Sequence, residues 1–168
     1  LDEAFLDVTV NKKGFELAVD IAKEIKQRIK SELNLTASAG ISYNKLLAKI
    51  ASDYRKPNGI CTIHPDKALE FVAKLPVEDL WGVGKKTAQR MHYMGIFNGE
   101  QLRSCSLQHL ITMFGKAGPS FYNYARAIDE REVITDRTRK SVGCEHTFVE
   151  DLSLPSAILI ELYHLVVE

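Results

Sequence analysis

The N-terminal third of the chain combines a clear helical period with short apolar segments. Apolar side chains recur at every fourth residue, at Leu17, Ile21, Ile25 and Ile29. With Lys and Glu at the intervening positions, this spacing predicts an amphipathic helix over residues 15–33. A second apolar stretch, which Ser42 can cap, predicts a helix that runs to about Tyr54.

Short runs of small or β-forming apolar residues lie before, between and after these two helices. They predict three strands, over residues 1–10, 35–41 and 60–63. The order strand, helix, strand, helix, strand predicts an α/β layer with βαβαβ connectivity.

Beyond residue 66 the pattern changes to short helices separated by Gly, Pro and Ser. The predicted helices cover residues 66–75, 85–94, 99–103, 106–114 and 117–128. Residues 129–139 are charged and poor in apolar side chains, which favours a linker. After it, a strand is predicted over 141–149 and a helix over 154–167.

The charge is balanced in total but not along the chain. The 168 residues carry 22 Lys and Arg against 22 Asp and Glu. Residues 81–140 carry 10 basic and 5 acidic groups, whereas residues 141–168 carry 5 acidic groups and no Lys or Arg. A cationic middle favours an anionic partner such as nucleic acid, which the total charge alone would argue against. No apolar run approaches the roughly 20 residues of a membrane span, and the three cysteines lack zinc-site spacing.

Residues 80–88, Leu-Trp-Gly-Val-Gly-Lys-Lys-Thr-Ala, have the pattern of a helix-hairpin-helix element. Glycines let the backbone approach a phosphate closely, and the N–H groups of the following helix point toward it. Lys85 and Lys86 add positive charge at the same place. Such a turn binds the sugar-phosphate backbone without reading the bases. Gly95 and Ile96 are typical of a second element of the module, and an ordinary helix–helix turn is the alternative.

Asp2 and Glu3, followed by Asp7, form a second candidate site. Adjacent carboxylates on a strand point to opposite faces, so both reach one site only at a strand end or bend. Hard oxygen ligands of this kind suit Mg²⁺ in phosphoryl transfer. By themselves, these residues are more typical of a solvated acidic surface.

Two groups of basic residues also allow alternative interpretations. Lys45 and Lys49 lie one turn apart on the helix after Ser42 and could hold a triphosphate, although a solvated face with a Lys49–Asp53 ion pair is the simpler interpretation. The basic run at residues 137–141 suits either a strand along a nucleic-acid backbone or a charged linker.

Taken in order, these strings resemble the Y-family, lesion-bypass DNA polymerases, most closely their bacterial DinB type. Residues 1–7 (LDEAFLD) resemble the family motif S-x-D-E-A-(Y/F)-L-D. Residues 40–52 are similar to G-(I/V)-S-x-N-K-x-x-A-K-x-A-S, and the family's K-P-N-G follows at 56–59. The hairpin at 80–88 resembles the thumb of the family, and residues 139–143 resemble the start of its little finger. The resemblance covers essentially the whole chain.

The resemblance implies a role for each matching residue. Asp2 and Glu3 would be two of three palm carboxylates that hold a Mg²⁺ pair, which activates the primer 3′-hydroxyl and stabilises the leaving pyrophosphate. Lys49 would contact the triphosphate of the incoming deoxynucleotide. The residues implied to contact primer-template DNA are Val83, Gly84, Lys85 and Lys86 at primer phosphates and Arg137, Arg139 and Lys140 at the template strand.

The resemblance also implies the domain organisation and the setting. Residues 1–56 would be the C-terminal part of the catalytic palm, 57–128 the thumb, 129–138 a linker and 139–168 a truncated little finger. The third carboxylate and the fingers would precede Leu1, so the 168-residue piece is expected to bind DNA weakly and not to extend primers. Trp81 stands where the family commonly has Pro. The longer protein would act in the bacterial cytoplasm, with a sliding clamp as a further partner in some family members.

Two other classes of protein compete with this interpretation. A non-catalytic helix-hairpin-helix DNA-binding module would make Asp2 and Glu3 incidental. An upstream strand with a further Asp, and a fingers segment with Tyr and Arg, would distinguish the polymerase from it. A nucleotide cyclase has a palm-like sheet but does not need a phosphate-binding hairpin.

Overall fold

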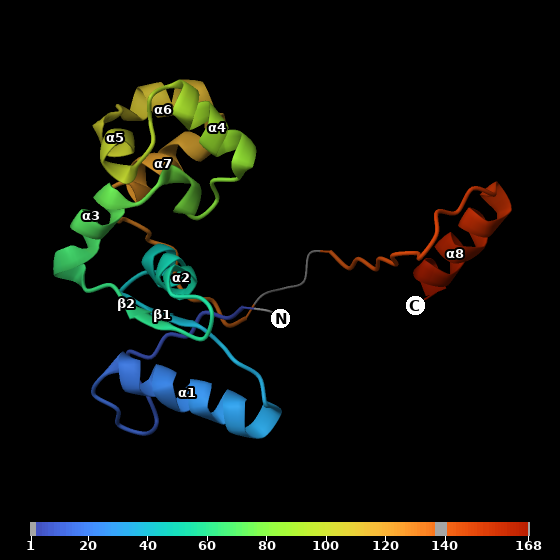
Figure 1. The fold of residues 1–168 in the computed structure, drawn as a ribbon, viewed down its shortest axis with the longest axis horizontal. Helices are drawn as coiled ribbons and strands as arrows, with labels where there is room; N and C mark the ends of the chain where they lie inside the picture. Colours follow the sequence, from blue (N-terminus) through green and yellow to red (C-terminus); the bar gives the residue numbers. More distant parts are fainter. Residues whose placement is uncertain (1–2, 137–140, 168) are drawn as a thin grey trace. The chain divides into compact units, whose positions relative to one another are not determined.

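A pair of short parallel strands lies between two helices in the N-terminal part of the protein (Figure 1). The computed structural model describes residues 3–136 and 141–167. β1 (Ala39–Ile41) pairs with β2 (Ile60–Thr62), with Gly40 opposite Cys61. The helix α2 (Lys45–Tyr54) connects the two strands and packs on both of them. This arrangement confirms the predicted strand–helix–strand order over this part of the chain.

The approach of α2 to β1 leaves no room for a side chain at Gly40. A Cβ atom there would lie 1.9 Å from the carbonyl oxygen of Ala48 and 2.3 Å from the nitrogen of Ser52. Both are backbone atoms of α2, so neither can rotate away. Glycine at this position therefore sets the distance between helix and strand.

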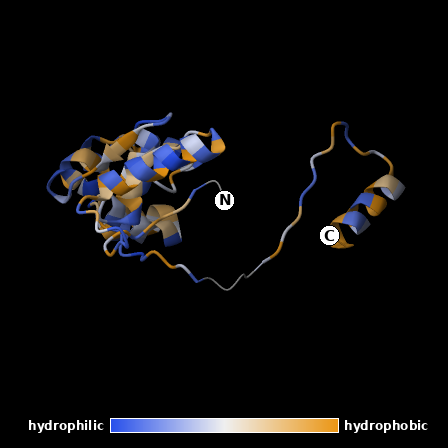
Figure 2. Cartoon of the chain, turned by 90° about the horizontal axis from the view of Figure 1, so that it is seen from below, coloured by the Kyte–Doolittle hydropathy of each residue, from blue (hydrophilic) through white to orange (hydrophobic). Residues whose placement is uncertain are grey.

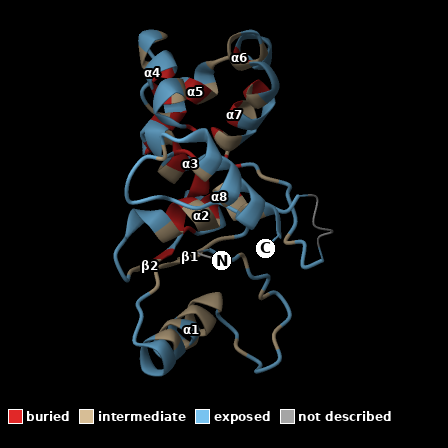
Figure 3. Ribbon diagram, turned by 90° about the vertical axis from the view of Figure 1, so that its right-hand side faces the viewer, coloured by how far each residue is buried: buried red, intermediate tan, exposed pale blue. Residues whose placement is uncertain are grey.

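The predicted amphipathic helix is α1, and it begins three residues later than expected, at Ala18–Leu33. It lies on the opposite face of the strand pair from α2 (Figures 1 and 3). None of its residues is fully buried. It ends at Asn34, which adopts a left-handed φ of 54° and donates its N–H to the carbonyl of Lys30.

Short helices fill the region that follows β2; the five α-helices up to residue 128 were predicted, whereas the two 3-10 turns were not, and the last of the five ends at Tyr124 and not at 128. They are α3 (Pro65–Lys74), η1 (Val77–Asp79), α4 (Lys85–Tyr93), α5 (Gly99–Ser104), α6 (Leu107–Phe114), η2 (Gly115–Ala117) and α7 (Gly118–Tyr124). Side chains of His64, Asn98 and Ser106 accept backbone N–H groups at the starts of α3, α5 and α6. These caps explain why the predicted starts of α3, α5 and α6 lie within one residue of the observed ones.

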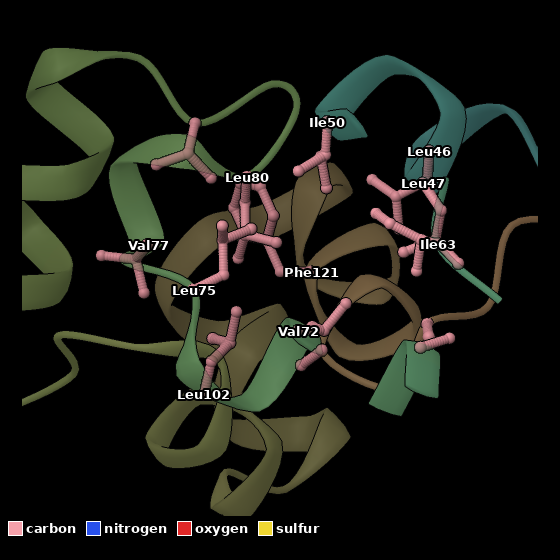
Figure 4. Packing of buried hydrophobic residues seen from close by; sticks show 14 of the residues in the cluster. Leu46, Leu47, Ile50, Ile63, Val72, Leu75, Val77, Leu80, Leu102 and Phe121 are labelled. Carbon is pink, nitrogen blue, oxygen red and sulfur yellow. The ribbon is translucent and has the colours of Figure 1, made fainter. Parts of the chain in front are cut away.

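One hydrophobic cluster extends from α2 through the short helices (Figures 3 and 4). Its largest fully buried side chains are Leu46, Leu47, Leu80, Met91, Leu102, Leu110, Val72 and Val77. Burying one such side chain contributes about 1.5–3 kcal/mol. The cluster therefore joins the strand-bearing part to the hairpin-bearing part within the unit formed by residues 1–133.

The predicted strand over residues 1–10 is wrong for the described residues 3–10, which contain no strand. The N–H of Thr9 donates to Asp7 Oδ1 at 2.9 Å, and this local bond competes with strand pairing. Leu6 and Val10 are 63% and 92% exposed, so the segment does not bury the apolar face that a strand would need. The described layer thus has two strands where the βαβαβ prediction has three.

The start of α2 also differs from the prediction. Asn44, not Ser42, is the N-cap of α2. The Ser42 hydroxyl instead donates to the carbonyl of Ile63 at 2.8 Å, beside the end of β2. The predicted strand over 35–41 begins only at Ala39.

The second unit, residues 134–168, contains α8 (Pro155–Val167), close to the predicted helix. The predicted strand over 141–149 is wrong, because these residues have no regular structure. A strand here would need a neighbouring strand to pair its backbone N–H and C=O groups, and the described part of this unit contains none. Hydrophobic and polar positions are interleaved along α8 (Figure 2). No helix in the described ranges is long and apolar enough to cross a membrane.

Candidate active site and nucleic-acid interface

The hairpin between η1 and α4 leaves open space over its two glycines. Gly82 has a φ of +86°, which favours glycine. Gly84 is the N-cap of α4, and no side chain caps the helix there. A Cβ atom at either glycine would meet nothing within 4 Å. A ligand can therefore approach the N–H groups at the start of α4, which attract anions.

The other predicted residues of the hairpin are the buried Val83 and the exposed Lys85 and Lys86. Val83 is 8% exposed, and its N–H donates to the carbonyl of Leu80 at 3.0 Å. Lys85 and Lys86 are exposed in the first turn of α4. The structure thus brings Val83, Gly84 and the two lysines together at one helix start, with geometry that suits a phosphate.

Lys49 on α2 lies between two carboxylates that are distant in sequence. Its Nζ atom is 2.5 Å from Glu3 Oε1 and 3.0 Å from Asp53 Oδ2. Burial acts to lower the pKa of Lys49, but the hydrogen bonds and charges of Glu3 and Asp53 outweigh it and raise that pKa. Lys49 therefore remains a cation beside Glu3, and the Lys49–Asp53 ion pair expected from the sequence is also present.

Lys56 joins the same group of charges, although sequence reasoning did not single it out. Its Nζ atom is 2.6 Å from Asp53 Oδ1, so one carboxylate holds two lysines. Burial acts to raise the pKa of Asp53, but the bonds from Lys56 and Lys49 lower it overall. The i,i+3 spacing from Asp53 is the sequence signal that could have revealed Lys56.

The N-terminus of α2 is already occupied by side-chain acceptors. Asn44 Oδ1 accepts the N–H of Leu47 at 2.9 Å, and Asp129 Oδ2 accepts the N–H of Leu46 at 2.9 Å. Lys45 donates to the carbonyl of Glu132 at 3.3 Å. An anion beside α2 would therefore be met by the side chains of Lys49 and Lys56 more readily than by the start of the helix.

Acid is expected to weaken the Asp129 bond and destabilise the fold. Burial acts to raise the pKa of Asp129, but the hydrogen bonds and charge of Arg131 lower it overall. A lowered pKa in the folded state contributes stability above the unfolded-state pKa of about 3.9, and this contribution is lost as the pH falls through the folded-state pKa. In urea unfolding between pH 6 and pH 3, Asp129→Asn should therefore flatten the acid-induced loss of stability. The exposed Asp20→Asn is the control, and an unchanged slope in Asp129→Asn would contradict the expectation.

Four predicted site residues cannot be placed. Asp2, Arg137, Arg139 and Lys140 lie outside the described residues. Of the predicted catalytic and nucleotide-binding residues, Glu3 and Lys49 are described and in contact. The segment that carries Glu3 also reaches the hairpin, since the rings of Phe5 and Trp81 lie 5.7 Å apart.

The donor chemistry of Glu3 fits a hard divalent cation such as Mg²⁺. Its side chain is 55% exposed, so water can complete a coordination shell around a bound ion. Within the described ranges, no group of three or more His, Cys, Asp or Glu is placed to hold a metal ion. Glu3 is thus a suitable metal ligand by its chemistry and its exposure.

Comparison with known proteins gives matches along the whole chain. Residues 1–53 match the impB/mucB/samB family, and residues 65–96 match the IMS family HHH motif. The second match confirms the predicted helix-hairpin-helix element. The chain is 61% identical over 168 residues to DNA polymerase IV of Bacteroides fragilis, and 59% identical over 158 residues to DNA polymerase IV of Akkermansia muciniphila. These matches cover 100% and 94% of this chain but only 46% and 44% of the relatives, so the chain spans less than half of their length.

The chain is also similar to solved structures of DNA polymerases. The chain is similar to DinB from Sulfolobus solfataricus, with a TM-score of 0.70 and 32% identity over 76% of this chain and 38% of that one. It is also similar to the insertion ternary complex of Dbh DNA polymerase, with a TM-score of 0.66 and 30% identity over 71% of this chain and 35% of that one.

Proposed function

Because the chain belongs to the impB/mucB/samB family, that of the Y-family DNA polymerases, we propose that it is part of a template-directed polymerase that extends a primer past damaged template bases. The observation that carries the proposal is the 61% identity to a DNA polymerase IV over the whole chain. Under this proposal, residues 1–56 form part of the palm and 57–128 the thumb. Residues 129–138 are then the linker, and 139–168 the start of the little finger.

The charged group on α2 serves the incoming deoxynucleoside triphosphate. Asp2 and Glu3 would hold Mg²⁺, which when bound would neutralise charge that develops on the transferred phosphoryl group. Lys49 and Lys56 face the triphosphate as cations, with Asp53 fixing both ammonium groups. The ion pair between Glu3 and Lys49 keeps the Lys49 ammonium group next to the proposed metal site.

The hairpin holds the primer strand. Backbone N–H groups at the start of α4 and the cations of Lys85 and Lys86 bind its phosphates, while Val83 fixes the turn to the core. Arg137, Arg139 and Lys140 contact the template strand. Because these contacts go to phosphates, the polymerase binds DNA without regard to sequence.

Replacing both hairpin lysines should weaken DNA binding in a salt-dependent way. Each phosphate contact contributes about 0.9 to the slope of log affinity against log salt. Lys85→Ala/Lys86→Ala in the full-length protein should therefore reduce that slope by about 2 in a fluorescence-anisotropy titration of primer-template DNA. Lys67→Ala/Lys74→Ala on α3 removes the same charge from an exposed site and is the control. Equal slopes in the two variants would count against the hairpin contact.

Primer extension by the full-length protein tests the function as a whole. With Mg²⁺, deoxynucleoside triphosphates and a template that contains an abasic site, we expect products longer than the lesion position. A protein that binds the primer-template but never extends it would instead be a non-catalytic helix-hairpin-helix module, and the proposed function would fail.

A further inference from the structure

Residues 127–132, which we call the strap, follow α7 and are hydrogen-bonded to the start of α2. The carbonyl of Ala127 accepts the Tyr43 hydroxyl at 3.1 Å and Asn44 Nδ2 at 2.9 Å. The carbonyl of Glu132, at the other end of the strap, accepts Lys45 Nζ at 3.3 Å. Three consecutive residues at the start of α2 are thus bonded to strap residues more than 80 positions away.

Asp129 is the buried centre of the strap. Its side chain is 2% exposed, and its Oδ2 atom accepts the N–H of Leu46 at 2.9 Å. The same carboxylate accepts Arg131 Nε at 2.7 Å and Arg131 Nη2 at 2.8 Å, in a bidentate pair. A buried carboxylate with three such donors holds a single geometry, because losing any of them leaves charge unsatisfied.

Arg131 also contacts Trp81, at the entry of the hairpin. Its guanidinium lies 4.1 Å from the centre of the Trp81 ring and 5.6 Å from that of Tyr124. Trp81 directly precedes Gly82, the first glycine of the hairpin. A chain of contacts therefore runs from the first turn of α2, through Asp129 and Arg131, to the entry of the hairpin.

A cleft lies between α2 and the hairpin, and Trp81, which Arg131 contacts, is one of its lining residues. The cleft has a volume of about 550 Å³, and Lys49 and Asp53 line it from α2 while Trp81 and Gly82 line it from the hairpin. Any rotation of α2 against Trp81 changes the separation between Lys49 and the hairpin. The strap bonds to α2 at Leu46, three residues before Lys49, and contacts the ring of Trp81 on the hairpin side.

We propose that Asp129 and Arg131 are positioning residues, which hold the triphosphate-binding side chains of α2 in register with the primer-binding hairpin. This inference rests on the proposed function. Under this proposal the two residues act on the substrate sites through Leu46 and Trp81. Misplacement of reacting groups by about 1 Å can cost up to about 10²-fold in rate, so a loosened strap slows insertion while each binding site stays intact.

The test is single-turnover insertion of one nucleotide by the full-length protein, at saturating DNA and nucleotide. Asp129→Asn and Arg131→Gln should each lower the insertion rate by about 10-fold or more, with the Kd for primer-template DNA changed by less than about 3-fold. Arg126→Gln is the matched control. Arg126 lies just before the strap, and its guanidinium stacks 3.5 Å from the centre of the Tyr122 ring. It donates to the carbonyls of Tyr122 and Arg103 and, among the described residues, forms no hydrogen bond to α2 or the hairpin.

Melting temperature separates positioning from general stability. Arg126→Gln should lower the melting temperature about as much as Arg131→Gln does, yet leave the insertion rate within about 2-fold of the wild type. If Asp129→Asn fails to fold, Trp81→Leu removes the ring partner of Arg131 without unpairing a buried charge, and should slow insertion as Arg131→Gln does.

Two results would overturn the inference. One is an unchanged insertion rate in folded Arg131→Gln and Trp81→Leu, and the other is an equal loss of rate in Arg126→Gln. A wild-type protein that extends no primer is a different outcome, because it refutes the proposed function itself.

Discussion

Glu3→Gln in the full-length protein should lower the rate of primer extension by about 10³-fold. Gln keeps the size of the side chain but removes the negative charge that pairs with Lys49 and that, under the proposed function, would bind Mg²⁺. A metal ion contributes several kcal/mol of transition-state stabilisation, and about 4 kcal/mol corresponds to this loss of rate. The measurement is extension of a labelled primer at saturating DNA and nucleotide.

The control for this substitution is Glu32→Gln, which neutralises an exposed carboxylate paired with Arg28 on α1. It should leave the extension rate unchanged within about 2-fold. Glu3→Gln should also keep the wild-type affinity for primer-template DNA, because Glu3 pairs with Lys49 on α2, whereas the proposed primer contacts are made by the hairpin. Extension above about a tenth of the wild-type rate would remove Glu3 from the active site.

Gly40→Val should destabilise the protein by at least about 4 kcal/mol. Val is a better strand former than Gly, so propensity alone predicts a gain. The added Cβ atom would instead lie 1.9 Å from the backbone oxygen of Ala48, and β1 would have to move away from α2. Losses of this size are exceptional for one substitution and leave little of a typical folding free energy.

Urea unfolding of the full-length protein measures this effect. Gly84→Ala is the matched control, because a Cβ atom there meets nothing within 4 Å and φ is −79°, which any residue adopts. Its stability should stay within about 1 kcal/mol of the wild type. A Gly40→Val protein as stable as Gly84→Ala would show that α2 and β1 do not meet so closely.

Local signals explain what the sequence could predict. The starts of α5 and α6 were found to within one residue, because the caps Asn98 and Ser106 act on their own neighbours. The hairpin was found because Gly82 has a φ of +86°, a local backbone need that favours glycine, and because Gly84 and two lysines follow it at the start of a helix. Strand predictions at 1–10 and 141–149 failed because a strand needs a partner, and apolar composition does not supply one.

Long-range contacts explain what the sequence could not predict. Residues 129–138 have the charge of a linker, yet Asp129 is buried against the N–H of Leu46, 83 residues away. The Lys49–Glu3 pair likewise joins residues 46 positions apart. The resemblance named both residues for the active site, but only the fold brings their side chains into contact.

The most direct test compares three full-length proteins by two numbers, the Kd for primer-template DNA and the single-turnover rate of nucleotide insertion at saturation. The proteins are the wild type, Glu3→Gln and Lys85→Ala/Lys86→Ala. If Glu3 serves the chemistry and the hairpin lysines bind DNA, Glu3→Gln should lower the insertion rate and leave the Kd unchanged. The lysine variant should raise the Kd and keep an insertion rate within a few-fold of the wild type. A loss of both quantities in each variant, or of neither, would contradict the assignment of chemistry to Glu3 and of DNA binding to the hairpin.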